Sequence, residues 1–160
     1  MQPIQTPSTI EFVTNSPSDT QDLGRDIGSR AQPGDVLLLI GDLGAGKTTL
    51  TQGILWGLGG EEYARSPTFV LVSEYEARLK LYHIDLYRID KLSELDDLGI
   101  VEILDGPGVT VIEWADRALE AFPSERLEVR FIRAQNDSRI LKLSSTSPRY
   151  DHYFERNQPT

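Results

Sequence analysis

The segment Val36–Leu50, VLLLIGDLGAGKTTL, decides the fold of this chain of 160 residues. Its first five residues form a continuous apolar run, as in a strand that is covered on both faces of a sheet. Gly41–Thr48, GDLGAGKT, matches the pattern G-x-x-x-x-G-K-[ST]. Thr48–Leu58 then has the character of a helix, which Gly59-Gly60 would end. A strand, a glycine-rich loop and a helix in this order predict a phosphate-binding loop (P-loop).

The residue types in the loop explain how it would hold a nucleotide. Glycines let the backbone fold into a concave nest whose N–H groups point at phosphate oxygens. The helix that follows presents the positive end of its dipole to the same anion. We expect Lys47 to reach the β- and γ-phosphates of ATP and the Thr48 hydroxyl to ligate Mg²⁺. Asp42 could cap the loop backbone or orient an attacking water.

A second carboxylate is expected at the end of a neighbouring apolar strand, facing the loop. Asp85 ends one such strand and Glu113 ends another, and both remain candidates. Either can instead be a solvated carboxylate at the end of a strand. His83 is interpreted as structural, because a single histidine in a strand usually is, and Trp114 as a core residue.

The rest of the chain alternates between strand and helix patterns. Strands are predicted at Thr9–Thr14, Phe69–Tyr75, Leu79–Asp85, Val109–Glu113, Leu127–Arg133 and Arg139–Ser144. Further helices are predicted from Ser16-Pro17 to Arg30, over Ser93–Leu98 and over Ala115–Phe122. The alternation predicts an α/β fold, a P-loop NTPase-like three-layer sandwich whose sheet is mixed but mostly parallel, with helices on both faces. The antiparallel members would come from the two hairpins at 69–85 and 127–144.

Length and composition set further bounds. We expect one P-loop ATPase domain over residues 1–145, followed by a polar, flexible C-terminal tail over residues 146–160. The absence of cysteine fits a reducing compartment, and neither a signal peptide nor a membrane span is recognisable, so a cytoplasmic location is expected. The net charge of −9 argues against a general nucleic-acid surface and favours only indirect contact with RNA.

Several patterns of strong nucleotide hydrolases are missing. Leu86 follows Asp85, so there is no Asp-Glu pair, and no N-K-x-D motif for guanine occurs. No arginine-rich lid is visible, although Arg65 or Arg88 could lie near phosphates. These absences predict an ATP hydrolase that is weak when alone.

Four ordered motifs, with a fifth segment, resemble one family. They are GDLGAGKTTL at Gly41–Leu50, SPTF at Ser66–Phe69, HIDLYR at His83–Arg88 and IEW at Ile112–Trp114, with SDTQDLG at 18–24. Together they closely resemble the TsaE (YjeE) family of small bacterial ATPases over roughly residues 10–145. The resemblance implies a requirement in forming threonylcarbamoyladenosine at position 37 of tRNAs that read codons beginning with A. It also implies that the protein acts with the TsaD and TsaB proteins and supports turnover of their complex, touching tRNA only through it.

The resemblance also implies roles for individual residues. Lys47, Asp85 and Glu113 would be catalytic, with Thr48, Glu113 and Asp85 around Mg²⁺; which of the two carboxylates contacts the metal stays open. The residues predicted to bind ATP are Thr20, Asp42, Leu43, Gly44, Ala45, Gly46, Lys47, Thr48, Thr49 and Thr68. Thr20 would lie near the adenosine, and Thr68 would belong to a switch-like loop. A nucleotide-gated binding module, in which hydrolysis is incidental, is the alternative, and a small-molecule kinase is a more distant one.

Overall fold

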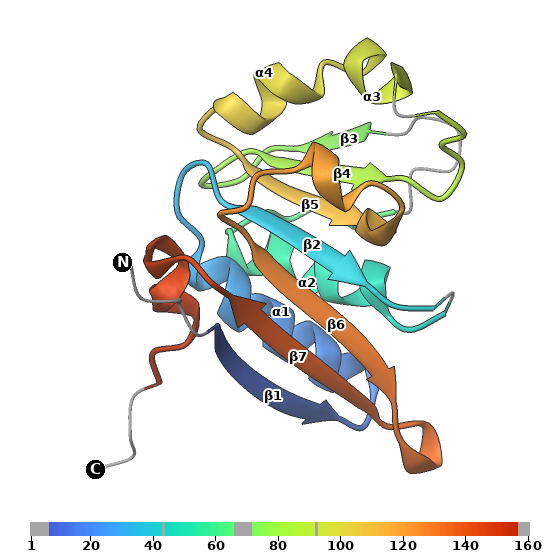
Figure 1. Cartoon of the computed structure of the whole chain (residues 1–160). Helices are drawn as coiled ribbons and strands as arrows, with labels where there is room; N and C mark the ends of the chain where they lie inside the picture. The colour runs from blue at the N-terminus through green and yellow to red at the C-terminus, as the bar shows by residue number, and fades with distance from the viewer. Residues whose placement is uncertain (1–6, 43, 66–71, 92, 157–160) are drawn as a thin grey trace, which may run out of the picture.

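One seven-stranded sheet runs through the computed structural model, which describes residues 7–42, 44–65, 72–91 and 93–156, the side chain of Arg117 excepted. The strand order is β1-β7-β6-β2-β5-β4-β3 (Figure 1). The strands are β1 Ser8–Thr14, β2 Val36–Ile40, β3 Val72–Tyr75, β4 Leu81–Asp85, β5 Val109–Glu113, β6 Leu127–Arg133 and β7 Arg139–Ser145. The predicted strands are therefore present, although residues 69–71 lie outside the described part of the chain.

The direction of the strands confirms a mixed, mostly parallel sheet. β6, β2, β5 and β4 are mutually parallel, whereas β3 pairs antiparallel to β4 and β7 antiparallel to β6. β1 pairs antiparallel to β7 and so runs with the central strands. Both predicted hairpins are confirmed. The turn between β6 and β7 contains Asn136 and Asp137 in left-handed conformations, with φ of 59° and 62°.

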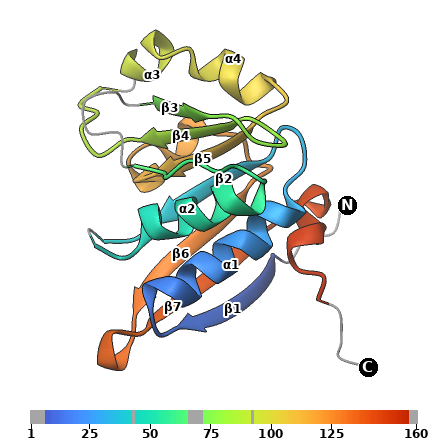
Figure 2. The same ribbon diagram turned by 180° about the vertical axis from the view of Figure 1, so that it is seen from behind.

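Helices cover both faces of the sheet, as predicted. α1 (Pro17–Arg30) and α2 (Lys47–Gly57) lie on one face, seen in front in Figure 2. Residues of α3 (Ser93–Asp97) and α4 (Ile100–Asp105) pack on the other face. A hydrophobic core fills the space on each face of the sheet. β2 is apolar throughout because Leu37 and Leu39 pack in the core on the α1–α2 face, while its other three residues pack in the core on the α3–α4 face.

Four glycines allow α1 and α2 to touch backbone to backbone. A Cβ atom on Gly28 would lie 2.2 Å from the Ile54 carbonyl oxygen, and one on Gly24 would lie 2.5 Å from the Leu50 carbonyl oxygen. The glycines of α2, at positions 53 and 57, are equally close to the backbone of α1. This contact places the two helix N-termini beside each other at one edge of the sheet (Figure 2).

The segment after β5 differs from the predicted helix over Ala115–Phe122. It forms two short 3-10 helices, η1 (Ala115–Arg117) and η2 (Leu119–Ala121). The continuous helix is wrong because Ala118, with φ −152° and ψ 40°, interrupts it. α4 was not predicted, since a six-residue helix between two glycines shows too few turns for a helical period to be recognised.

The C-terminal segment is packed on the domain, whereas the sequence predicted a loose tail over residues 146–160. Pro148–Tyr153 forms the 3-10 helix η4, and the side chains of Tyr150 and Tyr153 are fully buried. Tyr150 accepts a hydrogen bond of 2.8 Å from the Val36 backbone N–H. Most residues around the two buried tyrosines are polar, so the average composition of the segment predicted a loose tail. Residues 157–160 lie outside the described part.

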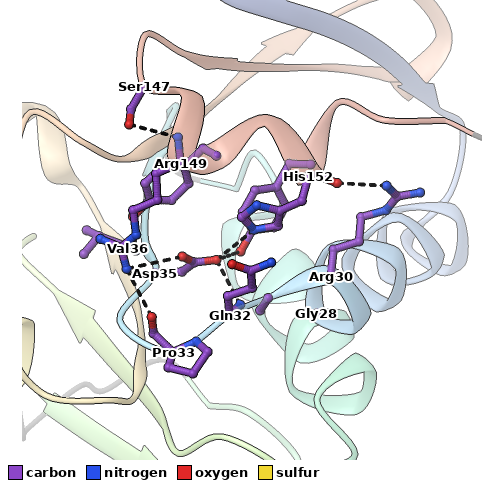
Figure 3. Close-up of polar contacts among 12 residues, drawn as sticks. Gly28, Arg30, Gln32, Pro33, Asp35, Val36, Ser147, Arg149 and His152 are labelled. Carbon is purple, nitrogen blue, oxygen red and sulfur yellow. Dashed lines mark hydrogen bonds and ion pairs between the residues drawn. The ribbon is translucent and has the colours of Figure 1, made fainter.

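The buried carboxyl group of Asp35 ties this segment to the start of β2. Its Oδ2 accepts hydrogen bonds from the Tyr153 hydroxyl and from the Gln32 backbone N–H, the latter at 3.0 Å. His152 Nε2 lies 3.2 Å from the same oxygen, and Figure 3 shows Gln32 and His152 converging on Asp35. Arg30 of α1 donates to the His152 carbonyl oxygen at 3.0 Å. Residues 147–156 therefore bridge α1 and the central strand.

Candidate functional site

The carboxyl ends of three parallel strands meet at one edge of the sheet and bring the predicted residues together. Gly41 follows β2, Asp85 ends β4 and Glu113 ends β5. Asp85 is in register with Glu113, which is in register with Leu39. The last position of β4, the last of β5 and the start of the loop therefore lie side by side. Ligands of open α/β sheets bind at this kind of edge.

The loop after β2 has the backbone that the motif requires. Gly44 and Gly46 adopt φ angles of 77° and 104°, which a side chain would strain. A Cβ on Gly46 would meet nothing within 4 Å, so this position is kept by backbone conformation and not by crowding. α2 begins immediately afterwards at Lys47, with its N-terminus at the loop. The predicted ligand Leu43 lies outside the described residues, as does the Ser66–Phe69 motif with Thr68.

Lys47 is folded back into the loop. Its ammonium group donates to the carbonyl oxygens of Gly41 and Asp42, the second at 3.2 Å. The ammonium nitrogen also lies 3.6 Å from the centre of the Trp114 ring, a cation–π contact. Burial lowers the pKa of Lys47, and the nearby carboxylates, Glu113 first among them, oppose that shift. A desolvated ammonium group in this position can form strong ionic hydrogen bonds with an anion.

Trp114 is therefore more than the core residue that the sequence suggested. It packs partly on the α3–α4 side of the sheet, and its ring also lies against Tyr87 at 5.1 Å between centroids. Its φ of 60° is unusual for a bulky residue. Such a conformation directly after Glu113 turns the indole toward Lys47, and strained backbone of this sort clusters at functional sites.

Thr48, Glu113 and His83 form a chain of contacts that runs from the loop into the interior of the sheet. The Thr48 hydroxyl donates to Glu113 Oε2 at 3.1 Å. The same carboxylate oxygen accepts a hydrogen bond from His83 Nε2. Glu113 is 4% exposed and His83 is fully buried. The sequence offered no signal for this pairing, because the two residues are far apart in the chain and belong to neighbouring strands.

Asp85 lies on the same face of β4 as His83, since side chains of a strand alternate. It is 8% exposed, and its Oδ1 accepts a hydrogen bond of 2.9 Å from the Tyr87 backbone N–H. That contact fixes one carboxylate oxygen in the turn after β4. Of the two predicted carboxylates, Glu113 is the one that hydrogen-bonds Thr48.

A cavity of about 300 Å³ adjoins the loop on the side of α1. It is lined by Thr14, Asn15, Ser16, Pro17, Thr20, Gly44, Ala45, Gly46, Thr49, Asp137 and Arg139. Thr20, Ala45 and Thr49 were predicted for the nucleotide site and do line this cavity. Thr20 is buried, and its hydroxyl donates to the Thr14 hydroxyl at 2.9 Å. The contribution of Asp137 and Arg139 was missed, because only the strand order brings the β6–β7 turn to this edge.

The oxygen donors at this edge suit Mg²⁺. A threonine hydroxyl and carboxylates are hard ligands, and Mg²⁺ is commonly held by one or two carboxylates together with substrate phosphates and water. Within the described ranges there is no group of three or more histidine, aspartate or glutamate side chains that could hold a metal by itself. The residues present therefore fit a Mg²⁺ that arrives with a nucleotide better than a resident transition metal.

The fold and the loop define the class: this is an α/β protein of the P-loop type. The TsaE family model, threonylcarbamoyl adenosine biosynthesis protein TsaE, matches residues 14–141, and the chain belongs to that family. TsaE of Bacillus subtilis is 42% identical over 147 residues, covering 91% of this chain and 92% of the relative. TsaE of Nostoc is 44% identical over 131 residues, covering 78% and 79%.

A solved structure agrees. The crystal structure of Bacillus subtilis YdiB superposes with a TM-score of 0.82 at 36% identity and covers 93% of each chain. No helix in the described residues has the length and apolar character to cross a membrane.

Proposed function

We propose that this protein is a P-loop ATPase that binds ATP with Mg²⁺ and is required for threonylcarbamoylation of adenosine 37 in tRNAs reading codons that begin with A. Membership of the TsaE family supports the pathway. The observation that carries the chemistry is the edge where the loop, Thr48 and Glu113 meet beside the 300 Å³ cavity. The protein would act in the cytoplasm.

The geometry supports a division of labour around the nucleotide. The adenosine would enter the cavity beside Thr20, and the phosphates would lie in the nest between Gly44 and Thr49. Lys47 would exchange its two loop carbonyl partners for the β- and γ-phosphates, a gain because its ammonium is desolvated. Thr48 and Glu113 would hold Mg²⁺, which withdraws charge from the phosphates when bound. Asp85 would orient the attacking water or a water of the metal.

Intrinsic hydrolysis is expected to be slow. Phosphoryl transfer is accelerated mainly by positioning and by neutralising charge on the transferred group. In the described part of the chain, Lys47 is the cation that hydrogen-bonds inside the loop and Arg139 lines the adjoining cavity. No arginine of that part forms a hydrogen bond or ion pair with Thr48 or Glu113. An arginine supplied by a partner contributes about 10³–10⁵-fold in other P-loop systems. We propose that TsaD and TsaB complete the site and that tRNA contacts it only through them.

Single-turnover ATP hydrolysis tests this proposal. It would be measured for the protein alone, with the TsaD–TsaB heterodimer, and with tRNA. We expect a slow rate alone, acceleration by the heterodimer and little effect of tRNA by itself. A fast rate that the heterodimer does not change, or stimulation by tRNA alone, contradicts the proposal. Tight ATP binding without turnover under any condition would instead support a nucleotide-gated binding module.

A further inference from the structure

His83 is a buried residue at the centre of the candidate site to which the proposed ATPase cycle assigns no step. It lies in the middle of β4, fully buried, and its Nε2 faces the Glu113 carboxylate. Nδ1 is buried and has no hydrogen-bond partner among the described residues. A carboxylate can only accept a hydrogen bond, so Nε2 carries the proton and Nδ1 does not in the neutral ring. Within the described residues, the polar contact of the His83 ring is therefore its hydrogen bond to the Glu113 carboxylate.

Glu113 needs that contact to keep one orientation. It is 4% exposed, so its carboxylate can exchange few bonds with water. Its Oε2 accepts from two donors, the Thr48 hydroxyl at 3.1 Å and the His83 ring, while Oε1 lies 3.4 Å from Thr48. Thr48 lies in the first turn of α2, directly after Lys47, and would turn toward a bound metal. His83 lies in β4 and is fully buried, so we expect it to keep its place when Thr48 turns.

We propose that His83 is a positioning residue that holds the Glu113 carboxylate in the orientation needed to bind Mg²⁺ with the nucleotide. This inference rests on the proposed function, because it concerns the same site. Side chains that hydrogen-bond metal ligands orient them, and losing such a partner typically weakens metal affinity about 10–100-fold. His83 acts through Glu113 and touches neither the nucleotide nor the reacting atoms.

Two amide substitutions of His83 distinguish a positioning role from a role in packing alone. In His83→Gln the side-chain NH₂ replaces Nε2 at a similar reach, so the donor to Glu113 is kept. In His83→Asn the amide ends near the position of Nδ1 and is too short to reach Glu113. The two variants share polarity and differ in reach. His152→Asn is a matched control, because His152, the other histidine of the chain, contacts Asp35 at the opposite end of β2.

The measurement is calorimetric binding of the non-hydrolysable analogue adenylyl imidodiphosphate, with chelator and across a Mg²⁺ titration, alongside ligand-free melting. We expect His83→Asn to weaken Mg²⁺ binding about 10–100-fold. Its affinity for the analogue in chelator should stay within about twofold of that of the parent. His83→Gln and His152→Asn should retain the parental Mg²⁺ dependence. The loss of Mg²⁺ affinity among the variants should not parallel their loss of melting temperature. If His83 were purely structural, the two losses would run in parallel.

Each other outcome is decisive. If His83→Asn binds Mg²⁺ as the parent does, or if His83→Gln is impaired as strongly as His83→Asn, the positioning role is wrong while the proposed ATPase stands. If the parent protein binds the analogue without any Mg²⁺ dependence, or not at all, the proposed function fails and this inference fails with it.

Discussion

Replacing Tyr153 by phenylalanine tests whether the C-terminal segment is part of the folded domain. The Tyr153 hydroxyl donates to Asp35 Oδ2 in a site from which both side chains exclude water. Hydrogen bonds to charged groups contribute about 1.5–3 kcal/mol to stability. A change of 1 kcal/mol shifts the melting temperature of a chain this size by about 2–4 °C. We therefore expect Tyr153→Phe to lower it by about 3–12 °C.

Tyr153→Ala extends the test to the packing of the ring. Truncating a buried aromatic side chain costs about 3–5 kcal/mol, because a cavity remains. The two variants should be ranked by urea unfolding followed by circular dichroism. Tyr63→Phe is the control, since Tyr63 is 73% exposed, and it should change stability by less than about 0.5 kcal/mol. If Tyr153→Ala unfolds at the parental urea concentration, residues 147–156 form a loose tail and do not pack on the domain.

Four further outcomes are expected. Lys47→Ala should abolish binding of ATP measured by calorimetry while the ligand-free melting temperature changes little, because the lysine belongs to neither hydrophobic core and its side-chain contacts among the described residues are with the loop and Trp114; normal turnover in a folded variant would refute the P-loop assignment. Glu113→Gln should bind ATP but lose most turnover in a phosphate-release assay, and a parental rate would remove the carboxylate from the mechanism. Gly28→Ala should lower the free energy of unfolding, measured by urea denaturation, by about 1–3 kcal/mol through crowding between α1 and α2, despite a better helix propensity; a more stable variant would mean that the helices separate freely. Burial raises the pKa of Tyr150 and of Tyr153, so above pH of about 10 only the unfolded state loses these protons, and stability should fall by up to about 1.4 kcal/mol per pH unit for each tyrosine, a slope that phenylalanine variants should reduce.

The sequence determined the elements whose signals are local. The apolar run Val36–Ile40 and the glycine loop after it were recognisable because buried strands and phosphate nests each require particular residues at consecutive positions. The helix predicted to begin at Ser16-Pro17 is α1, and the Ser16 hydroxyl accepts a hydrogen bond from the Asp19 N–H at its N-terminus. Parallel strand ends share one edge of a sheet, so Asp85 and Glu113 could be assigned to the loop side before any contact was known.

Only the tertiary structure decided which side chains meet across elements. The His83–Glu113–Thr48 contact joins three elements, and its partners depend on strand order and register, which no local pattern encodes. The β6–β7 turn reaches the cavity for the same reason. Tyr150 and Tyr153 looked like part of a polar tail, because a segment with two apolar anchors has no periodicity to reveal it. Their burial follows from the buried carboxyl group of Asp35 and the Val36 N–H, both more than a hundred residues earlier in the chain, and from the core surface beside them.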